Sequence, residues 1–338
     1  CTIVVHVDDL GVTAYTEGEL DSVYAVLVAK YGEVTVTRGD RHEYLGMVWD
    51  FSTPGQVRVS MDAYVNRMLE GCGVEGTAKT PARDDLSERS GELSDSEVCK
   101  KKQEWFHSYA AKCLYLAKRL RLECLPTVGY LATRVTCPVL SDVSKLERLL
   151  RYVRGTRGQG LVLRVGEGRV RVTAPIDAAF AVHSDRKSHT GGAVVIGDGA
   201  VVLAKSSKHW QKLVTKSSTE SELVGAADFA STELVGAADF ASTAYGVQAF
   251  LRGQGYKLPP IRIEQDNQSA MALMAKGRPT SDRSRHIDIK YFWLHDREAQ
   301  KEIEIVYVPT AQMGRANCLT KPLQGSQFVS ERTELLGE

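Results

Sequence analysis

Three acidic residues stand near the ends of expected secondary-structure elements in the second half of the chain. Asp177 follows the strand pattern VRVTAPI, Glu222 lies at the start of the helical pattern TESELVGA, and Asp266 follows the strand pattern IRIEQ. If these elements lie side by side, their carboxylates repel one another unless cations neutralise them. Carboxylate oxygens are preferred ligands of Mg²⁺ and Mn²⁺, and a pair of such ions can drive phosphodiester hydrolysis. The sequence therefore predicts a divalent-metal site at these three residues.

Each acidic residue also has an ordinary structural interpretation. Thr219 and Glu222 have the T-x-x-E spacing of a helix capping box. Asp266 could cap the helix expected over NQSAMALM, and Asp177 could be an ordinary residue at the end of a strand. Asp8 and Asp9 stand at the tip of an apolar hairpin pattern, where aspartate is a common turn residue. Adjacent aspartates on such a turn can also present carboxylates to a metal.

The elements that must position these carboxylates are predicted from apolar periodicity and turn residues. We expect a strand–turn–strand at the N-terminus, a helix ending before Gly32, strands over 42–51 and 56–61, and a short helix over 63–73. The polar stretch 75–100 is a linker candidate, and 102–154 is mostly helical. Strands then follow from 160, with a helix over 219–253, a strand over 261–265, helices within 267–299, a strand over 302–309 and a final helix from about 315. This order indicates an α/β domain with a mixed sheet.

The expected helix over 219–253 contains an exact repeat. ELVGAADFAST occupies 222–232 and recurs at 233–243. Eleven residues make almost three whole turns, so each copied side chain falls about 20° from its original face. Glu222 and Glu233 are therefore alternative ligands that cannot both reach one metal site. We predict Glu222, because the strand pattern WQKLVTKSS fixes the start of the helix beside Asp177.

Composition and charge favour a chain that binds a polyanion. The net charge of the 338 residues is +1, but residues 1–99 carry ten more acidic than basic side chains and residues 100–171 carry eleven more basic than acidic ones. A basic middle segment is typical of a nucleic-acid surface, although it could also be a solvated helix surface. Seven cysteines without a C-x-x-C pair argue against a zinc site and a disulfide framework, and for a reducing compartment. The chain begins at Cys1 inside a strand pattern, which we interpret as part of a longer polypeptide.

Motifs along nearly the whole chain resemble, in order, those of copia-type retrotransposon Pol polyproteins. In the first part they are VVHVDDLGVTAY, HEYLGMVWDF and VRVSMDAYVNRML, with His6 where the family has tyrosine. The middle part has FHSYAAKCLYLAKRL and LRYVRGTRGQGL. The last part has DAAFAVHSDRKSHTGG, KSSKHWQKLVTKSSTESEL, QDNQSAMAL, RSRHIDIKYFWLHD and VPTAQMGRANCLTKPL.

The resemblance implies a ribonuclease H domain with a mixed five-stranded sheet and helices. Asp177, Glu222 and Asp266 match three of the family's four acidic residues, and Asn317 stands where the fourth, an aspartate, is expected. Asparagine offers one neutral carbonyl oxygen in place of a carboxylate, so a second metal ion should bind more weakly. The implied cofactor is Mg²⁺ or Mn²⁺.

The resemblance also implies a nucleic-acid contact in the segment that follows Asp177. Arg186, Lys187, Ser188 and Thr190 match a hairpin that touches the phosphate backbone. An exposed polar turn is the alternative interpretation of this segment.

The predicted class is α/β (α+β), with four consecutive parts. These are a partial reverse-transcriptase palm (1–74), a linker (75–100), a helical thumb or connection (101–160) and a ribonuclease H-like domain (161–338). Asp8 and Asp9 would be a polymerase remnant, because the family's third palm aspartate and its fingers lie upstream of the motifs present here. The chain alone should not polymerise.

The expected activity is two-metal endonucleolytic hydrolysis of the RNA strand of an RNA–DNA hybrid. The expected partners are this hybrid and the upstream parts of the same polyprotein. We expect an intracellular location (cytoplasm, virus-like particle or nucleus) and no membrane span, because no run of eighteen apolar residues occurs. Two alternatives stay open. One is a catalytically inactive retrotransposon relic or nucleic-acid-binding module, and the other is a pure interaction domain without salt-dependent affinity for nucleic acid.

Overall fold

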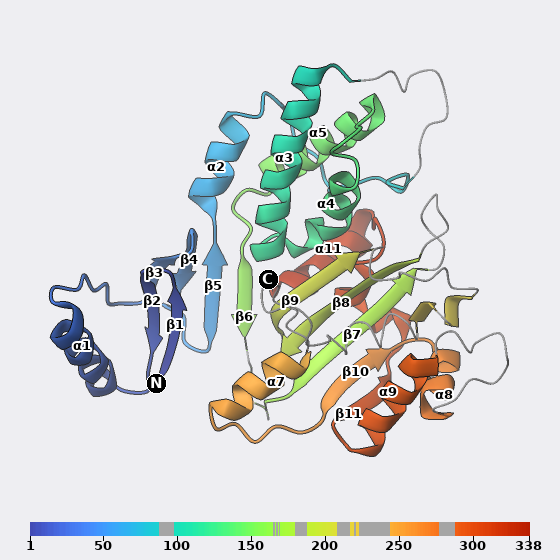
Figure 1. The fold of residues 1–338 in the computed structure, drawn as a ribbon. Coiled ribbons are helices and arrows are strands. Elements are labelled where there is room, and N and C mark those ends of the chain that lie inside the picture. The colour runs from blue at the N-terminus through green and yellow to red at the C-terminus, as the bar shows by residue number, and fades with distance from the viewer. Residues whose placement is uncertain are drawn as a thin grey trace.

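The computed structural model describes most of the chain and contains three β-sheets (Figure 1). The described residues are 1–87, 98–164, 166, 168, 170–179, 188–207, 217–219, 221–222, 244–276 and 288–338. No helix within these ranges is long and apolar enough to cross a membrane.

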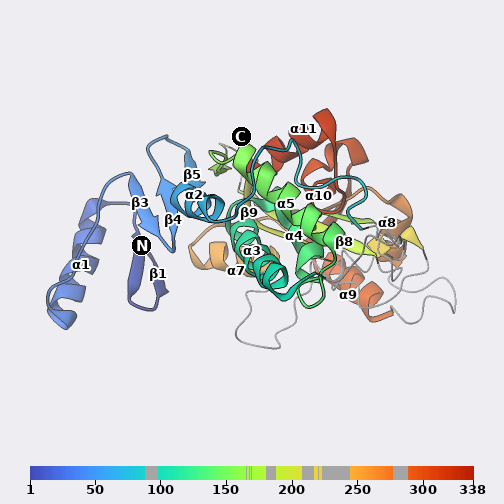
Figure 2. The same cartoon turned by 90° about the horizontal axis from the view of Figure 1, so that it is seen from above.

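The N-terminal segment is a small hairpin and a helix at one end of the molecule. Strands β1 (Thr2–His6) and β2 (Asp9–Thr13) pair antiparallel, and helix α1 (Glu17–Tyr31) follows. Thr16 and Glu19 form a capping box at the start of α1, which explains where this helix begins. None of the residues of α1 is buried. Both views place this segment away from helices α8 and α9 at the other end (Figures 1 and 2).

The second sheet contains a hairpin that the sequence analysis missed. We predicted a single strand over 42–51, but the structure has β3 (Arg41–Tyr44) and β4 (Met47–Asp50), which pair antiparallel. The turn between them places Leu45 at φ 55° and Gly46 at φ 73°. Leucine rarely adopts positive φ, so Gly46 inside the strand pattern was the one local signal of this turn. Strand β5 (Gln56–Ser60) pairs with β4 on one side and with β6 (Leu161–Arg164) on the other. The strand at 161–164 thus completes the sheet of the first part of the chain.

Between β5 and β6, the chain forms a layer of helices. It consists of α2 (Asp62–Glu70), α3 (Lys100–Arg119), the 3₁₀ turn η1 (Leu122–Cys124), α4 (Leu125–Ala132) and α5 (Leu140–Gly155). At its centre, Arg121 Nε lies 2.7 Å from Glu123 Oε1, and both side chains are fully buried. The Tyr152 hydroxyl donates to the same carboxylate oxygen at 3.1 Å. Each charge of this buried pair keeps a partner, so removal of either side chain would leave the other charge buried and uncompensated.

The third sheet is the mixed five-stranded sheet predicted from the sequence, and the fold class is confirmed. Its strands are β7 (Val172–Ala179), β8 (His189–Ile196), β9 (Ala200–Ser207), β10 (Ile261–Gln265) and β11 (Ile303–Tyr307), in the order β11-β10-β7-β8-β9. β7, β8 and β9 are antiparallel neighbours, whereas β10 runs parallel to both β7 and β11. The number and the directions of these strands agree with the mixed five-stranded sheet that the family resemblance implies.

The two faces of this sheet bury two separate cores. On one face, Ala193 and Val195 pack with side chains of α3, α4, α5 and α11 (Gly325–Leu336), so the helical layer and the sheet share one core. On the other face, Ile176, Val194 and Ile263 pack with α7 (Ala244–Gly253), α8 (Gln268–Lys276) and α9 (Asp288–Ala299). The domain boundary near residue 160 stays a prediction, because the shared core crosses it.

Candidate metal centre

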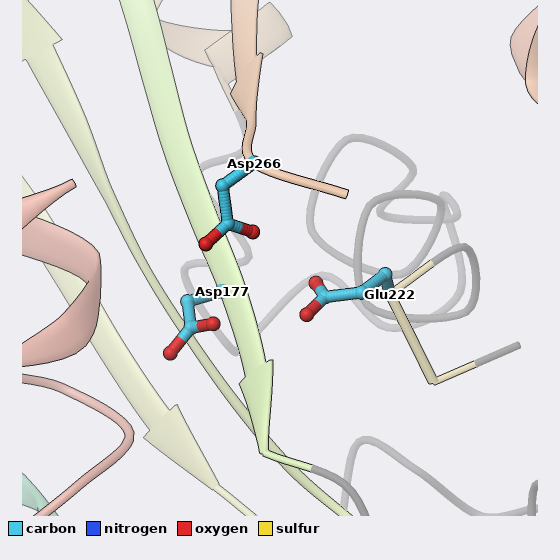
Figure 3. Close-up of side chains that lie close together, drawn as sticks. All are labelled: Asp177, Glu222 and Asp266. Atoms are coloured by element: carbon cyan, nitrogen blue, oxygen red, sulfur yellow. The ribbon is translucent and has the colours of Figure 1, made fainter. Parts of the chain in front are cut away.

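The three carboxylates singled out in the sequence come together in the structure. Ligand oxygens of Asp177, Glu222 and Asp266 all lie within 4.8 Å of one another, and their side chains point toward a common centre (Figure 3). Asp177 and Glu222 are 3% and 4% exposed, whereas Asp266 is partly exposed. Mg²⁺ and Ca²⁺ bind oxygen ligands at roughly 2.0–2.6 Å. Oxygens within 4.8 Å of one another can therefore bind one such ion together.

The strand register explains why the two aspartates meet. β7 and β10 are parallel, and Ala174 pairs with Ile263 and Pro175 with Glu264. Extending this register by two residues brings Asp266 level with Asp177. Parallel strands end at the same edge of a sheet, so both carboxylates lie at the carboxyl edge.

Glu222 reaches this edge from a helical turn. The Ser221 amide donates to the Ser217 carbonyl oxygen at 3.1 Å, which marks that turn. Gln265 Nε2 donates to Glu222 Oε2 at 2.9 Å and holds the carboxylate toward β10. Burial, together with the nearby carboxylates of Asp177 and Asp266, raises the pKa of Glu222 to about 8. The site therefore carries more negative charge than the protein around it neutralises, which favours a cation.

Asp177 has two neighbours that the sequence analysis did not predict. The Thr320 hydroxyl donates to Asp177 Oδ2, and Lys321 Nζ lies 3.1 Å from the same oxygen. Both residues follow α10 (Gly314–Asn317), which packs on β7 and β8. Gly191 pairs with Asp177 across the sheet, and a Cβ at Gly191 would lie 2.7 Å from the Leu319 backbone. A glycine at that position lets the segment after α10 approach Asp177.

Asn317 lies beside the cluster without lining it. It is 3% exposed, and its Nδ2 donates to the Thr310 carbonyl oxygen at 2.9 Å. Thr310 in turn donates through its hydroxyl to Asp266 Oδ2 at 2.7 Å. Thr310 therefore connects Asn317 to Asp266, and the Asn317 amide donates to the Thr310 backbone and not to the carboxylate cluster. The prediction that Asn317 takes a place in the catalytic set stays untested.

The three carboxylates open into a depression of about 780 Å³ at the carboxyl edge of the sheet. The depression is also lined by Asn267, Gln268, Tyr307, Thr310 and Lys321. A buried carboxylate cluster that opens to solvent can bind a hard divalent cation and present it to a phosphate group.

The other predicted site residues lie elsewhere. Asp8 and Asp9 are exposed on the N-terminal hairpin, on a sheet separate from the carboxylate cluster. Ser188 and Thr190 are 0% and 1% exposed, so neither side chain reaches the surface and the predicted phosphate contact is not supported for these two. The reason for Thr190 is that β8 is paired on both sides, with Ala178 and Ser207. Arg186, Lys187 and Glu233 lie outside the described residues.

Comparison with curated proteins finds relatives among retrotransposon polyproteins. The "Retrovirus-related Pol polyprotein from transposon RE1" of Arabidopsis thaliana is 31% identical over 209 residues, which are 60% of this chain and 13% of that protein. The polyprotein of transposon RE2 from the same plant matches with the same identity and coverage. Over these residues the chain is similar to the Pol polyproteins of these two transposons. The resemblance predicted from the sequence motifs is thereby confirmed.

The chain spans only 13% of the length of those two polyproteins. An uncharacterized mitochondrial protein of Arabidopsis thaliana also matches it, at 35% identity over 103 residues, which are 29% of this chain and 41% of that protein. No family model matches the chain. Among solved structures, ribonuclease H1 from the archaeon Halobacterium salinarum aligns with 44% of this chain and 93% of its own, at 18% identity and a TM-score of 0.29.

Proposed function

We propose that this chain hydrolyses the RNA strand of an RNA–DNA hybrid endonucleolytically, with residues 161–338 as the catalytic domain. The observation that carries the proposal is the meeting of Asp177, Glu222 and Asp266 within 4.8 Å at the carboxyl edge of the mixed sheet. These three residues would hold Mg²⁺ or Mn²⁺. When bound, the metal supplies Lewis-acid activation of water and stabilises charge at the scissile phosphate.

The protein's own residues prepare the site for this chemistry. Thr320 fixes the orientation of Asp177 through its hydroxyl, and Gln265 does the same for Glu222 through its amide. Before a cation binds, the raised pKa of Glu222 keeps its carboxyl largely protonated at neutral pH. Cation binding should therefore release a proton from Glu222, since a metal ligand binds in its deprotonated form.

The substrate class rests on the relatives and on charge. Retrotransposon polyproteins and a basic middle segment both favour a nucleic acid. In α3, Lys100 and Lys101 begin the helix, and Lys102 Nζ lies 4.0 Å from the Trp105 ring centroid. Lys100 and Lys101 can contact phosphates without reading sequence, whereas Lys102 Nζ is paired with Glu147 Oε1 at 3.1 Å. The upstream parts of the same polyprotein are proposed partners, and the activity would occur inside the cell, in the cytoplasm, a virus-like particle or the nucleus.

A cleavage assay tests the proposal. The purified chain is incubated with an RNA–DNA hybrid labelled on the RNA strand, in Mg²⁺ and in excess chelator. We expect cleavage only with Mg²⁺, and its loss in Asp177→Asn. The matched control is Asp198→Asn, since Asp198 is exposed in the β8–β9 turn at the opposite edge of the sheet. Equal cleavage by Asp177→Asn and the control would refute the proposal.

The second candidate is an inactive relic that still binds hybrid. This candidate is favoured by Asn317, which is neutral and stands where the fourth carboxylate is expected. The Asn317 amide donates to the Thr310 carbonyl. This candidate predicts salt-dependent binding of the hybrid without cleavage, and cleavage gained in Asn317→Asp.

A further inference from the structure

Lys321 places a positive charge inside the carboxylate cluster. Its Nζ lies 3.1 Å from Asp177 Oδ2, and the side chain is 42% exposed while that of Asp177 is 4% exposed. Lys321 also lines the depression that contains Asp177, Glu222 and Asp266. The Lys321 ammonium therefore lies beside the candidate metal site, on a side chain that is partly open to solvent, where a substrate phosphate would arrive.

The backbone determines where Lys321 lies. The Lys321 amide donates to the Asn317 carbonyl oxygen at 3.1 Å, and the Thr320 amide donates to the same oxygen at 3.1 Å. The close approach of Leu319 to Gly191 fixes the segment against the sheet beside Asp177. Thr320 and Lys321 both contact Asp177 Oδ2, so the protein itself already holds this oxygen.

Charge balance decides how many divalent ions the site can hold. Four carboxylates, the number that the family resemblance implies, would neutralise two divalent cations. Here the fourth position is the neutral Asn317, so three carboxylates balance one divalent cation and one lysine. A second divalent cation beside Lys321 would leave the cluster with a net charge of +2, and a like charge a few ångströms away is strongly disfavoured.

We infer that the Lys321 ammonium takes the place of the second divalent cation, so that the centre works with one metal ion and Lys321. The inference rests on the proposed hydrolysis. Lys321 would contact a non-bridging oxygen of the scissile phosphate and stabilise the charge that develops there. In that reaction the bond from water oxygen to phosphorus forms and the bond from phosphorus to the 3′-oxygen breaks. The attacking water gives a proton to solvent, and the departing 3′-oxygen takes up a proton from solvent and leaves as a hydroxyl.

Binding of Mn²⁺ without nucleic acid tests the inference apart from activity. Free Mn²⁺ is measured by electron paramagnetic resonance during titration of the wild type, of Lys321→Met and of the control Lys257→Met. Lys257 is exposed and does not line the depression. We expect one Mn²⁺ in the wild type and the control. Lys321→Met should bind its first Mn²⁺ at least about tenfold more tightly, because it lacks the competing charge, and should cleave hybrid at least about tenfold more slowly in saturating Mg²⁺.

The opposite signs of these two effects separate a role at the phosphate from a structural role, which would weaken both binding and cleavage. Equal Mn²⁺ affinity in Lys321→Met and wild type, or two ions bound by the wild type, would overturn the inference and leave the proposed function standing. No Mn²⁺ bound by any of the three proteins would overturn the proposed function and the inference with it. If Lys321→Met fails to fold by circular dichroism, Lys321→Gln replaces it in both measurements, with the same expected and contrary results.

Discussion

Replacing Glu222 by a neutral residue should remove a pH-dependent loss in the free energy of unfolding. Burial first, and then Asp177 and Asp266, raise the pKa of Glu222 from 4.5 to about 8. The folded chain therefore binds more protons than the unfolded chain between pH 4.5 and pH 8, and its stability must decrease as pH rises through that window. The slope is about 1.4 kcal/mol per pH unit. Over the whole window the loss reaches about 5 kcal/mol at most, since local rearrangement and water entry reduce it.

The variant Glu222→Gln keeps an oxygen that can accept the hydrogen bond from Gln265 and lacks the titrating group. We expect its free energy of unfolding to match the wild type near pH 4.5 and to exceed it increasingly up to pH 8. Urea unfolding from pH 5 to pH 9 in chelator measures the difference, with Glu304→Gln, an exposed residue of β11, as the control. Saturating Mg²⁺ should shrink the difference, because the ion stabilises the wild-type carboxylate. A difference that stays constant from pH 5 to pH 9 would refute the reasoning.

Three further predictions concern residues around the site and in the core. Glu123→Gln leaves Arg121 buried without its counter-charge and should lower the free energy of unfolding by about 3–5 kcal/mol in urea unfolding. Gly191→Ala places a methyl group against the Leu319 backbone and should cost about 1–3 kcal/mol by the same measurement. Because Gly191→Ala also pushes the segment after α10 away from Asp177, its Mn²⁺ affinity should change, whereas that of Glu123→Gln should not.

Part of the fold could be predicted from local sequence signals. The apolar strands around Asp177 and Asp266 and the capping box of α1 follow from residue types and spacing, and the structure has them. The hairpin at Leu45 and Gly46 was only weakly indicated, because Gly46 is a turn signal whereas leucine rarely adopts the positive φ that it has here. The pairing of β6 with β5 joins segments about a hundred residues apart, which no local pattern specifies.

The positions of some polar side chains also could not be predicted from the local sequence. Ser188 and Thr190 are typical of an exposed turn by composition, yet both are buried in the structure, Thr190 within β8 and Ser188 just before it. Lys321 could equally be a surface lysine by its sequence. It reaches Asp177 because α10 packs on the sheet where Gly191 has no side chain.

The sequence by itself determined which three carboxylates stand at the ends of elements, because apolar periodicity and turn residues are local properties of the chain. The tertiary structure alone decided that these carboxylates meet, how much negative charge the protein leaves on them, and that Lys321 lies among them. Distance and burial set electrostatic energies, and both arise only when β7, β10 and the segment after α10 pack together.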